Sequence, residues 1–292
     1  MTADLIVVPS TGDAHDPTVP FLERHIDTSI FLLSSLTELG PRAGPDRLSG
    51  NYWRIEEGGT TVAVFCLTQK GHLLAQTGQR SDLARVIVDT CQREATPLTG
   101  VVAEWTAART VWDVLIEAKQ ICPTYESNKL LYGLTLNPSS PLARPAPLCR
   151  RLSQDDFDQW DVLYLAHMRE EGAPVLDSAE QRAVSFRRML RGSRAWWGAF
   201  DGSGLAATVA LNASYKTSGL IGGLYTRVDK RRGGLARAIT AAAMHDCWHG
   251  KGIRRLVLLV NDDNVAARGL YESLGFTPRD RFGFLFGATG AL

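Results

Sequence analysis

One glycine-containing segment in the second half of the chain has the residues best suited to binding an anion. Residues 225–236 read Tyr-Thr-Arg-Val-Asp-Lys-Arg-Arg-Gly-Gly-Leu-Ala, between an apolar stretch typical of a strand and an alanine-rich stretch typical of a helix. The first turn of a helix presents unpaired N–H groups and a positive dipole end. Gly233 and Gly234 let a phosphate approach the backbone, and two arginines add charge. The pattern predicts a pyrophosphate site, although a helix that merely begins with glycine would look the same.

A second pattern follows at a fixed distance. It reads Asn264-x-x-Ala267-x-x-x-Tyr271-x-x-x-Gly-Phe, ending at residue 276. Together with the R-x-x-G-x-A spacing of residues 231–236, it resembles the two signatures of the GNAT N-acetyltransferase superfamily. The resemblance covers residues 148–287, about half of the chain.

The resemblance implies an α/β fold with a mixed sheet flanked by helices, acetyl-CoA as cosubstrate, and no metal. By the same resemblance, residues 225–228 form a splayed central strand that pairs with the pantetheine arm and polarises the thioester. The amides of residues 232–236 take the pyrophosphate, with Arg237 near the phosphates, Asn264 near the pantetheine and Tyr271 beside the sulfur. The residues expected to contact the cofactor are Tyr225, Thr226, Arg227, Val228, Arg231, Arg232, Gly233, Gly234, Leu235, Ala236, Arg237, Asn264, Ala267 and Tyr271.

Direct attack of an amine on a thioester needs a neutral amine, a stabilised oxyanion and a proton for the leaving thiolate. Tyr271 is the candidate general acid; the rival interpretation is a core tyrosine on the helix face of Ala267 and Leu274. The strand 219–225 contains no carboxylate or histidine, so a water relay is one possible base. Glu171 is the other, because the resemblance places it at the acceptor pocket, although a solvated acidic helix end fits the sequence equally well.

Other polar residues are interpreted as structural. His167 lies on a helical face with apolar neighbours and is read as a packing histidine. His245 and His249 are spaced like metal ligands but lack the acidic residue of an H-E-x-x-H motif. Cys247 shares a helical face with apolar residues, which favours core packing over nucleophilic catalysis.

The two halves of the sequence repeat one order of elements. The second half predicts helices at 153–171 and 178–190, strands at 196–200, 205–215 and 219–226, a helix at 233–248, a strand at 255–260, a helix at 264–275 and a strand at 282–286. The first half predicts helical structure at 19–39, strands at 52–55, 61–67 and 71–76, a helix at 81–91 and a strand at 100–103.

The first half lacks both signatures. We therefore expect a degenerate GNAT-like domain that cannot hold CoA, as in tandem GNAT proteins; an unrelated α/β domain is the alternative. Four prolines between residues 137 and 147 mark a linker. The expected domains are 1–137, a linker at 138–147, and the acetyltransferase domain at 148–292.

Composition narrows the class of partner. The 32 basic residues nearly balance 31 acidic ones, so the clustered positive field that binds nucleic acid or anionic membranes is not expected. The five cysteines contain no C-x-x-C pair, which indicates reduced thiols. No stretch approaches the roughly 20 apolar residues of a membrane span, and the first residues do not resemble a signal peptide. We expect a cytoplasmic monomer or homodimer.

The sequence thus predicts an N-acetyltransferase that moves an acetyl group from acetyl-CoA to a primary amine, most simply a small molecule, by direct attack in a ternary complex. One alternative is a CoA-responsive binding or regulatory protein without turnover, since the strand carboxylate is missing. A second is an acyltransferase that uses longer acyl chains or a protein amine.

Overall fold

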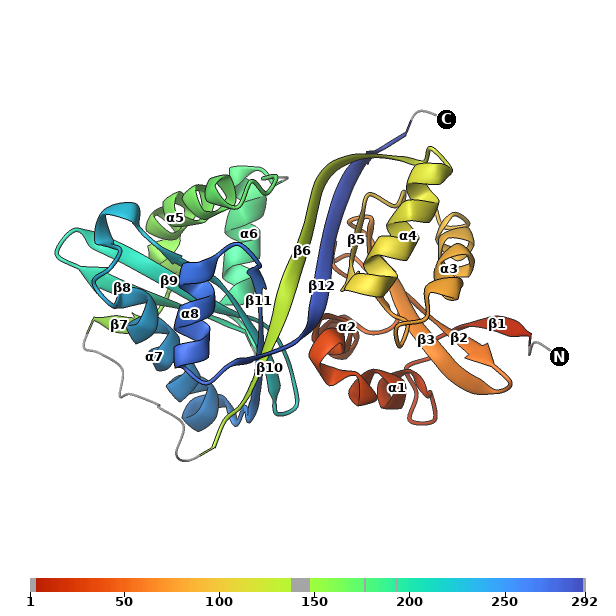
Figure 1. The fold of residues 1–292 in the computed structure, drawn as a ribbon, viewed down its shortest axis with the longest axis horizontal. Coiled ribbons are helices and arrows are strands. Elements are labelled where there is room, and N and C mark those ends of the chain that lie inside the picture. The colour runs from red at the N-terminus through yellow and green to blue at the C-terminus, as the bar shows by residue number, and fades with distance from the viewer. Residues whose placement is uncertain (1–3, 138–147, 176, 193, 291–292) are drawn as a thin grey trace. The chain divides into compact units, whose positions relative to one another are not determined.

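The computed structural model describes residues 4–137, 148–175, 177–192 and 194–290. The chain divides into two compact units, one made of residues 1–131 and 279–292 and the other of residues 132–278 (Figure 1). It therefore passes between the units twice, within strand β6 (Ile121–Thr135) and at the start of strand β12 (Thr277–Thr289). The predicted linker at 138–147 lies outside the described residues.

The first unit is a mixed sheet covered by helices. Its strands follow the order β1-β2-β3-β4-β5-β12-β6, with β4 and β5 parallel and β1 to β4 antiparallel. Its remaining elements are β1 (Leu5–Pro9), α1 (Thr18–Arg24), α2 (Ile26–Leu39), β2 (Gly50–Glu57), β3 (Thr60–Thr68), β4 (His72–Gln76), the 3-10 turn η1 (Ser81–Leu83), α3 (Ala84–Cys91), β5 (Gly100–Glu104) and α4 (Trp105–Glu117).

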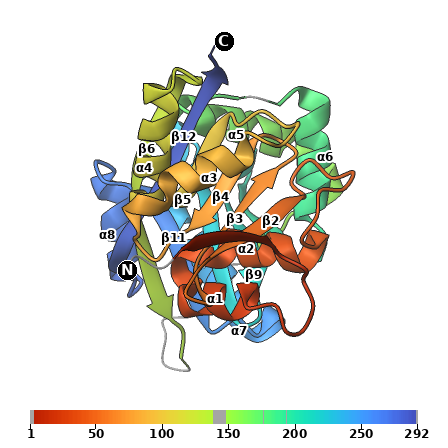
Figure 2. The ribbon, with the colours of Figure 1, turned by 90° about the vertical axis from the view of Figure 1, so that its right-hand side faces the viewer.

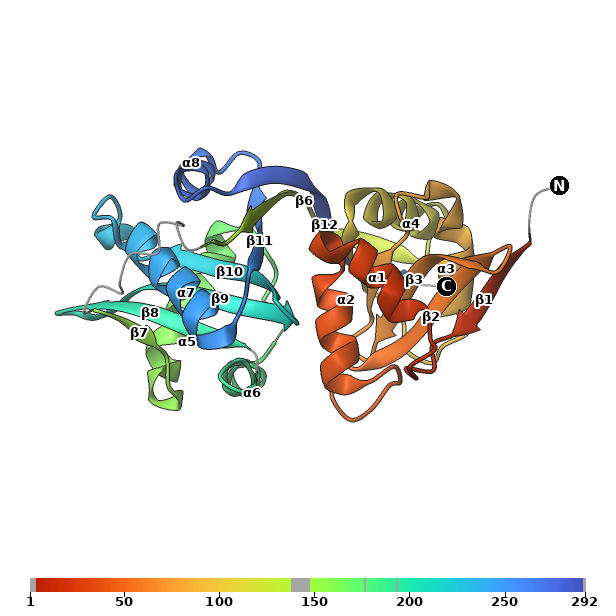
Figure 3. The same cartoon turned by 90° about the horizontal axis from the view of Figure 1, so that it is seen from below.

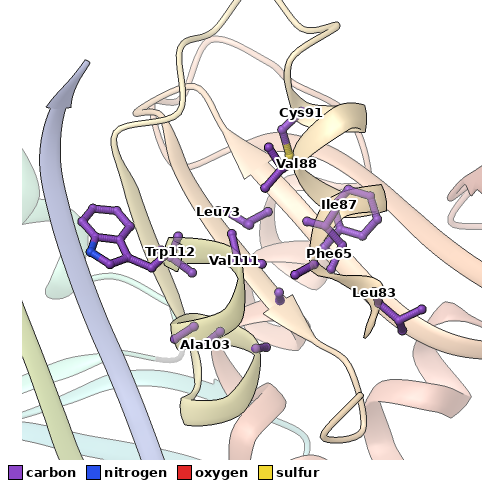
Figure 4. Close-up of a cluster of buried hydrophobic side chains, with 14 of the residues drawn as sticks. Phe65, Leu73, Leu83, Ile87, Val88, Cys91, Ala103, Val111 and Trp112 are labelled. Carbon is purple, nitrogen blue, oxygen red and sulfur yellow. The ribbon is translucent and has the colours of Figure 1, made fainter. Parts of the chain in front are cut away.

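Helices α3 and α4 pack on this sheet through a layer of mostly apolar side chains. Helix α3 crosses in front of β3, β4 and β5 in Figure 2, and Ile87 from its inner face is completely buried. Figure 4 shows side chains of both helices, including Ile87 and Val111, gathered with Phe65 and Leu73 from the strands. The helical spacing of the apolar residues predicted α3 correctly, because only one face of the helix meets the sheet.

The second unit repeats this plan. Its strands follow the order β6-β11-β10-β9-β8-β7, and β10 and β11 are parallel. Its elements are β7 (Cys149–Arg151), η2 (Gln154–Asp156), α5 (Phe157–Glu170), α6 (Ala179–Met189), β8 (Ala195–Asp201), β9 (Gly204–Tyr215), β10 (Ser218–Thr226), η3 (Val228–Lys230), α7 (Leu235–Lys251), β11 (Arg255–Asn261) and α8 (Val265–Ser273). The α/β class and the order of these elements agree with the sequence-based prediction.

Helices α5 and α7 cover opposite faces of the second sheet, as Figures 1 and 3 show. Two adjacent tryptophans of β8 mark the two faces, because successive side chains of a strand alternate. Trp196 packs edge-on against Trp160 of α5, with ring centroids 5.3 Å apart. The indole N–H of Trp197 instead donates to Asp246 of α7 at 3.0 Å.

The last strand of the chain completes the first sheet. Residues Phe282 to Phe286 of β12 pair antiparallel with β5, while β6 takes the position beside β11 in the second unit. The sequence-based boundaries had placed residues 279–292 in the C-terminal domain. The structure differs because an apolar alternating segment specifies a strand but not the strand with which it pairs. Among the described residues, no helix has the length and apolar character required to cross a membrane.

Candidate active site

Strands β10 and β11 separate halfway along their length. They pair from Ser218–Arg255 to Ile221–Leu258, yet both strands continue beyond that point. On its other edge, β10 has a bulge against β9 between Gly222 and Tyr225. Such a bulge bends a strand and increases its twist. The backbone of β10 beyond Ile221 therefore has no β11 partner and can hydrogen-bond a ligand.

Gly223 makes this bulge possible. Its φ of +61° is disfavoured for side-chain-bearing residues. A Cβ at this position would lie only 2.5 Å from the Cη2 atom of Trp196, so the bulge can only be built on glycine. The aromatic packing beneath the sheet thus helps to fix where β10 leaves β11.

The loop after β10 leads to a helix start without acidic residues. Arg232 and Gly234 have φ angles of +67° and +79°, and Gly234 is the N-cap of α7, without a side-chain cap and with no acidic residue in the first turn. The first amide with a helical acceptor is that of Ala238, which donates to the Gly234 carbonyl at 3.0 Å. The preceding amides of the turn lack helical partners, and a Cβ on Gly234 would meet nothing within 4 Å. This geometry fits a pyrophosphate.

Arg231, the first residue of the R-x-x-G-x-A pattern, is held by protein groups. Its Nε donates to the Thr226 carbonyl at 3.0 Å, and its Nη2 contacts Glu170 at 2.6 Å. Its guanidinium also lies 5.4 Å from the centre of the Tyr225 ring. Arg231 therefore joins the end of β10 to the end of α5, a role that the sequence pattern did not indicate.

The other cations of the loop fall into two groups. Arg227 pairs with Asp229 at 2.6 Å, and Lys230 pairs with Asp201 at 2.8 Å. Arg237 donates to the neutral hydroxyl of Ser273 at 2.5 Å, and Arg232 is exposed and makes no ion pair with any residue that the structure describes. Arg232 and Arg237 are thus the cations of this segment whose charge is left for phosphates.

Tyr271 lies on α8 and is almost completely buried, with 6% of its surface exposed. Its ring packs edge-on against Phe276, with centroids 5.9 Å apart. Burial raises the pKa of the Tyr271 phenol, and the negative charge of Glu171 raises it further. The phenol therefore stays protonated at neutral pH, as a proton donor requires.

Asn264 is the N-cap of α8, at the predicted start of this helix. Its Oδ1 accepts a hydrogen bond from the Ala267 amide at 3.0 Å. This capping bond accounts for asparagine at position 264. The contacts of Asn264 and Ala267 with the cofactor remain a prediction.

Glu171 is half-buried and bonded, so it is not simply a solvated helix end. It is the C-cap of α5, and its Oε2 accepts a hydrogen bond from Nδ2 of Asn261 at 3.1 Å. Asn261 ends β11 beyond the last β10 pair. Sequence analysis missed Asn261; the available signal was a polar residue directly after the apolar run 256–260.

The remaining sequence candidates take structural positions. The His167 ring stacks on Tyr225 with centroids 5.4 Å apart, so this packing histidine adjoins the site. The rings of His245 and His249 lie 4.4 Å apart on α7, and no group of three or more potential metal ligands occurs in the described part of the chain. Cys247 is fully buried, which raises its pKa to about 12; core packing is confirmed.

Comparison with known proteins places this site in a family. Residues 157–276 match the model of the acetyltransferase (GNAT) family, whereas no curated protein matches the sequence. These residues therefore form a GNAT domain, and GNAT domains are acyltransferase domains that use acetyl-CoA.

Solved structures extend the likeness to the whole chain. A Drosophila protein is 14% identical, with a TM-score of 0.68 and coverage of 98% of this chain and 99% of that one. A tandem GNAT protein from the clavulanic acid biosynthesis pathway is 14% identical, with a TM-score of 0.54 and 99% coverage of each chain. A GCN5-related N-acetyltransferase from Sphaerobacter thermophilus is 13% identical, with a TM-score of 0.57, 99% of this chain and 97% of that one. At these identities the likeness concerns the fold, which is that of two GNAT-like units in tandem.

Proposed function

We propose that the second unit transfers an acetyl group from acetyl-CoA to the primary amine of a small molecule. The observation that carries the proposal is the gap between β10 and β11, which opens beside the acid-free start of α7. A buried tyrosine and a bonded carboxylate, Tyr271 and Glu171, belong to elements that meet near the same strand ends. The unit thus combines anion donors, unpaired strand backbone and proton-transfer groups.

The residues fit the acetyl donor in two places. The amides from Arg232 to Ala236 would hold the pyrophosphate, with Arg232 and Arg237 adding positive charge. The unpaired edge of residues 222–226 would bond the pantetheine amides, and one of its N–H groups would donate to the thioester oxygen as negative charge develops there. Val228, Leu235, Asn264 and Ala267 remain predicted contacts.

The proposed reaction assigns one proton transfer to Glu171 and one to Tyr271. The amine nitrogen forms a bond to the acetyl carbon while the carbon–sulfur bond breaks, and both electrons of that bond go to sulfur. Glu171 accepts the proton that the amine loses, and the Tyr271 phenol gives its proton to the thiolate, so the products are an amide and a thiol. Proton exchange with solvent then restores both groups. Glu171 in its ionised form also attracts a cationic amine.

The hydrogen-bonded Glu171 close to the Tyr271 phenol favours turnover over a purely CoA-responsive role, because the two groups can accept and supply the protons that amide formation moves. A longer acyl donor or a protein amine acceptor would use the same residues in the same roles. One activity screen that includes longer acyl donors and peptide amines therefore tests these alternatives as well.

The test is release of CoA thiol from acetyl-CoA with a panel of small primary amines. We expect Tyr271→Phe to lower kcat by about 100-fold, the usual size of a general-acid contribution, while acetyl-CoA affinity is kept. Because burial raises the pKa of Tyr271 above its ordinary value of 10.0, wild-type kcat should not fall through loss of this proton below pH 10.

Tyr125→Phe, at a half-buried tyrosine of the first unit, is the matched control and should keep wild-type kcat. Full turnover by Tyr271→Phe at every pH would remove its role as acid. Tight acetyl-CoA binding without thiol release for any small amine, peptide amine or longer acyl donor would instead establish a CoA-responsive protein.

A further inference from the structure

Asn261 connects the end of a strand to the end of a helix at the gap in the sheet. It is the last residue of β11, on the segment that no longer pairs with β10. Its Nδ2 donates to Oε2 of Glu171 at 3.1 Å, across 90 positions of sequence. Glu171 caps the C-terminal end of α5, so the hydrogen bond joins two elements at the point where β10 and β11 diverge.

The charges around this bond distinguish Glu171 from its neighbour Glu170. Glu170 is engaged by Arg231 at 2.6 Å. Glu171 is electrostatically coupled to Tyr271 of α8, and His167, one turn earlier on α5, stacks on Tyr225 of β10. Of the two adjacent carboxylates, only Glu171 combines a strand-end amide with proximity to the candidate acid.

We propose that Asn261 is a positioning residue that holds the Glu171 carboxylate in the orientation that accepts the proton of the incoming amine. The inference rests on the acetyl transfer proposed above. An amide N–H that donates to a carboxylate favours its ionised form, which is the form that a base needs. Asparagine does not titrate, so it supplies this donor across the pH range in which Glu171 changes charge. Holding one oxygen also limits rotation of the carboxylate, which reduces the cost of reaching a reactive geometry.

The test is a double-mutant cycle on kcat/KM for the amine, measured against pH. We expect Asn261→Ala to lower kcat/KM by about 10-fold, the lower end of the range for one hydrogen bond to a charged group, and to move the acidic limb to higher pH. In the Glu171→Gln background the same substitution should have no further effect, because the carboxylate that it orients is gone. Asn261→Asp keeps the shape but replaces the donor by a negative charge, and should lower kcat/KM more than Asn261→Ala.

The matched control is Asn51→Ala in the first unit, where Nδ2 of Asn51 donates to Glu94 at 2.7 Å. It should leave kcat/KM and the pH profile unchanged. Acetyl-CoA affinity, measured by calorimetry, should be the same in the wild type and both Asn261 variants, which shows that they are folded and retain the cofactor site. If Asn261→Ala does not fold, Asn261→Asp completes the cycle with Glu171→Gln.

Two failures can be told apart. Thiol release by the wild type, with Asn261 and Glu171 effects that simply add, would overturn the positioning role and leave the proposed function standing. An unmoved acidic limb in both Asn261 variants would do the same. Absence of thiol release by the wild type would overturn the proposed function itself, and the role of Asn261 with it.

Discussion

In each unit, a strand that pairs in parallel with its neighbour is followed by a helix. The two units differ in how far along the strand this parallel pairing extends. In the first unit, β4 pairs with β5 from His72 to Ala75, so only its last residue, Gln76, has no partner on β5. In the second unit, β10 pairs with β11 only from Ser218 to Ile221 and continues to Thr226. We call the segment from each of these strands to the next helix the first junction (β4 to α3) and the second junction (β10 to α7). The second junction therefore begins with an open strand edge, whereas the first begins with nearly complete pairing.

The first junction also satisfies its own polar groups. Arg80 binds both oxygens of Asp82, at 2.7 and 2.6 Å, and reaches Glu57 at 3.0 Å. Oε1 of Gln76 accepts the Gly78 amide at 2.7 Å, and Asp82 places a negative charge in the first turn of η1. An anion site therefore requires donors that the protein leaves unsatisfied, and two units with the same order of elements can differ in this respect.

The largest expected difference between the junctions is in cofactor binding. Gly234→Glu adds a side chain at φ +79° and a carboxylate at the start of α7, and should weaken acetyl-CoA binding at least ~100-fold, since backbone strain and charge repulsion act together. Gly78→Glu, also at positive φ (+58°) but in the first junction, should leave the affinity unchanged. Calorimetry measures both, and the wild type should bind one acetyl-CoA per chain.

A stoichiometry of two would contradict the expected difference between the units, because it would mean that the first unit also binds acetyl-CoA. Equal loss of affinity in the two glycine variants would do so as well. A melting temperature measured for each variant separates loss of the site from loss of the fold.

A smaller difference is expected between Arg232 and Arg80. Arg232→Ala should weaken acetyl-CoA binding by about 10-fold, the size of one charge-assisted hydrogen bond to phosphate. Arg80→Ala should have no effect, because its guanidinium is already shared between Asp82 and Glu57. The Arg232 effect should shrink as salt is added; an effect of Arg232→Ala that is independent of salt would contradict a phosphate contact.

The smallest effect concerns the helices that follow the parallel strands. Helix α4 is capped by the buried Glu104, which accepts the amides of Thr106 and Ala107, whereas α8 is capped by the neutral Asn264. Burial raises the pKa of Glu104, and the charge of Asp280 adds to this effect. The folded state therefore holds the proton more tightly than the unfolded chain does. The protonated Glu104 side chain therefore contributes fully to stability below pH 4.5, the ordinary pKa of a glutamate. This contribution is lost as the pH rises through the raised pKa.

Glu104→Gln should remove this contribution to the pH dependence, so the unfolding free energy should fall less steeply than in the wild type as pH rises above 4.5. Urea unfolding from pH 4 to 7 measures the slope. Glu117→Gln, at an exposed carboxylate of the same helix, is the control and should keep the wild-type slope. A steeper fall in Glu104→Gln would mean that hydrogen bonding outweighs burial at this carboxylate.

The sequence by itself determined the features that depend on local spacing. The helix starts predicted at residues 178 and 264 and the helical end predicted at residue 39 agree with the caps Ser178, Asn264 and Gly40. The glycine-containing start of α7 and the apolar strands before it were equally clear, and with them the family. These features are encoded by neighbouring residues, because capping bonds and one-sided burial repeat over a few positions.

Only the tertiary structure decided which distant groups meet. The bond from Asn261 to Glu171, the engagement of Arg231 by Glu170, and the pairing of β12 with β5 each join residues far apart in sequence. No spacing along the chain records such contacts, since they follow from the order of strands in the sheet and from where β10 bends away from β11. The local pattern therefore indicated an anion site at the start of α7, and the fold of the second unit brought Glu171 within hydrogen-bond distance of Asn261.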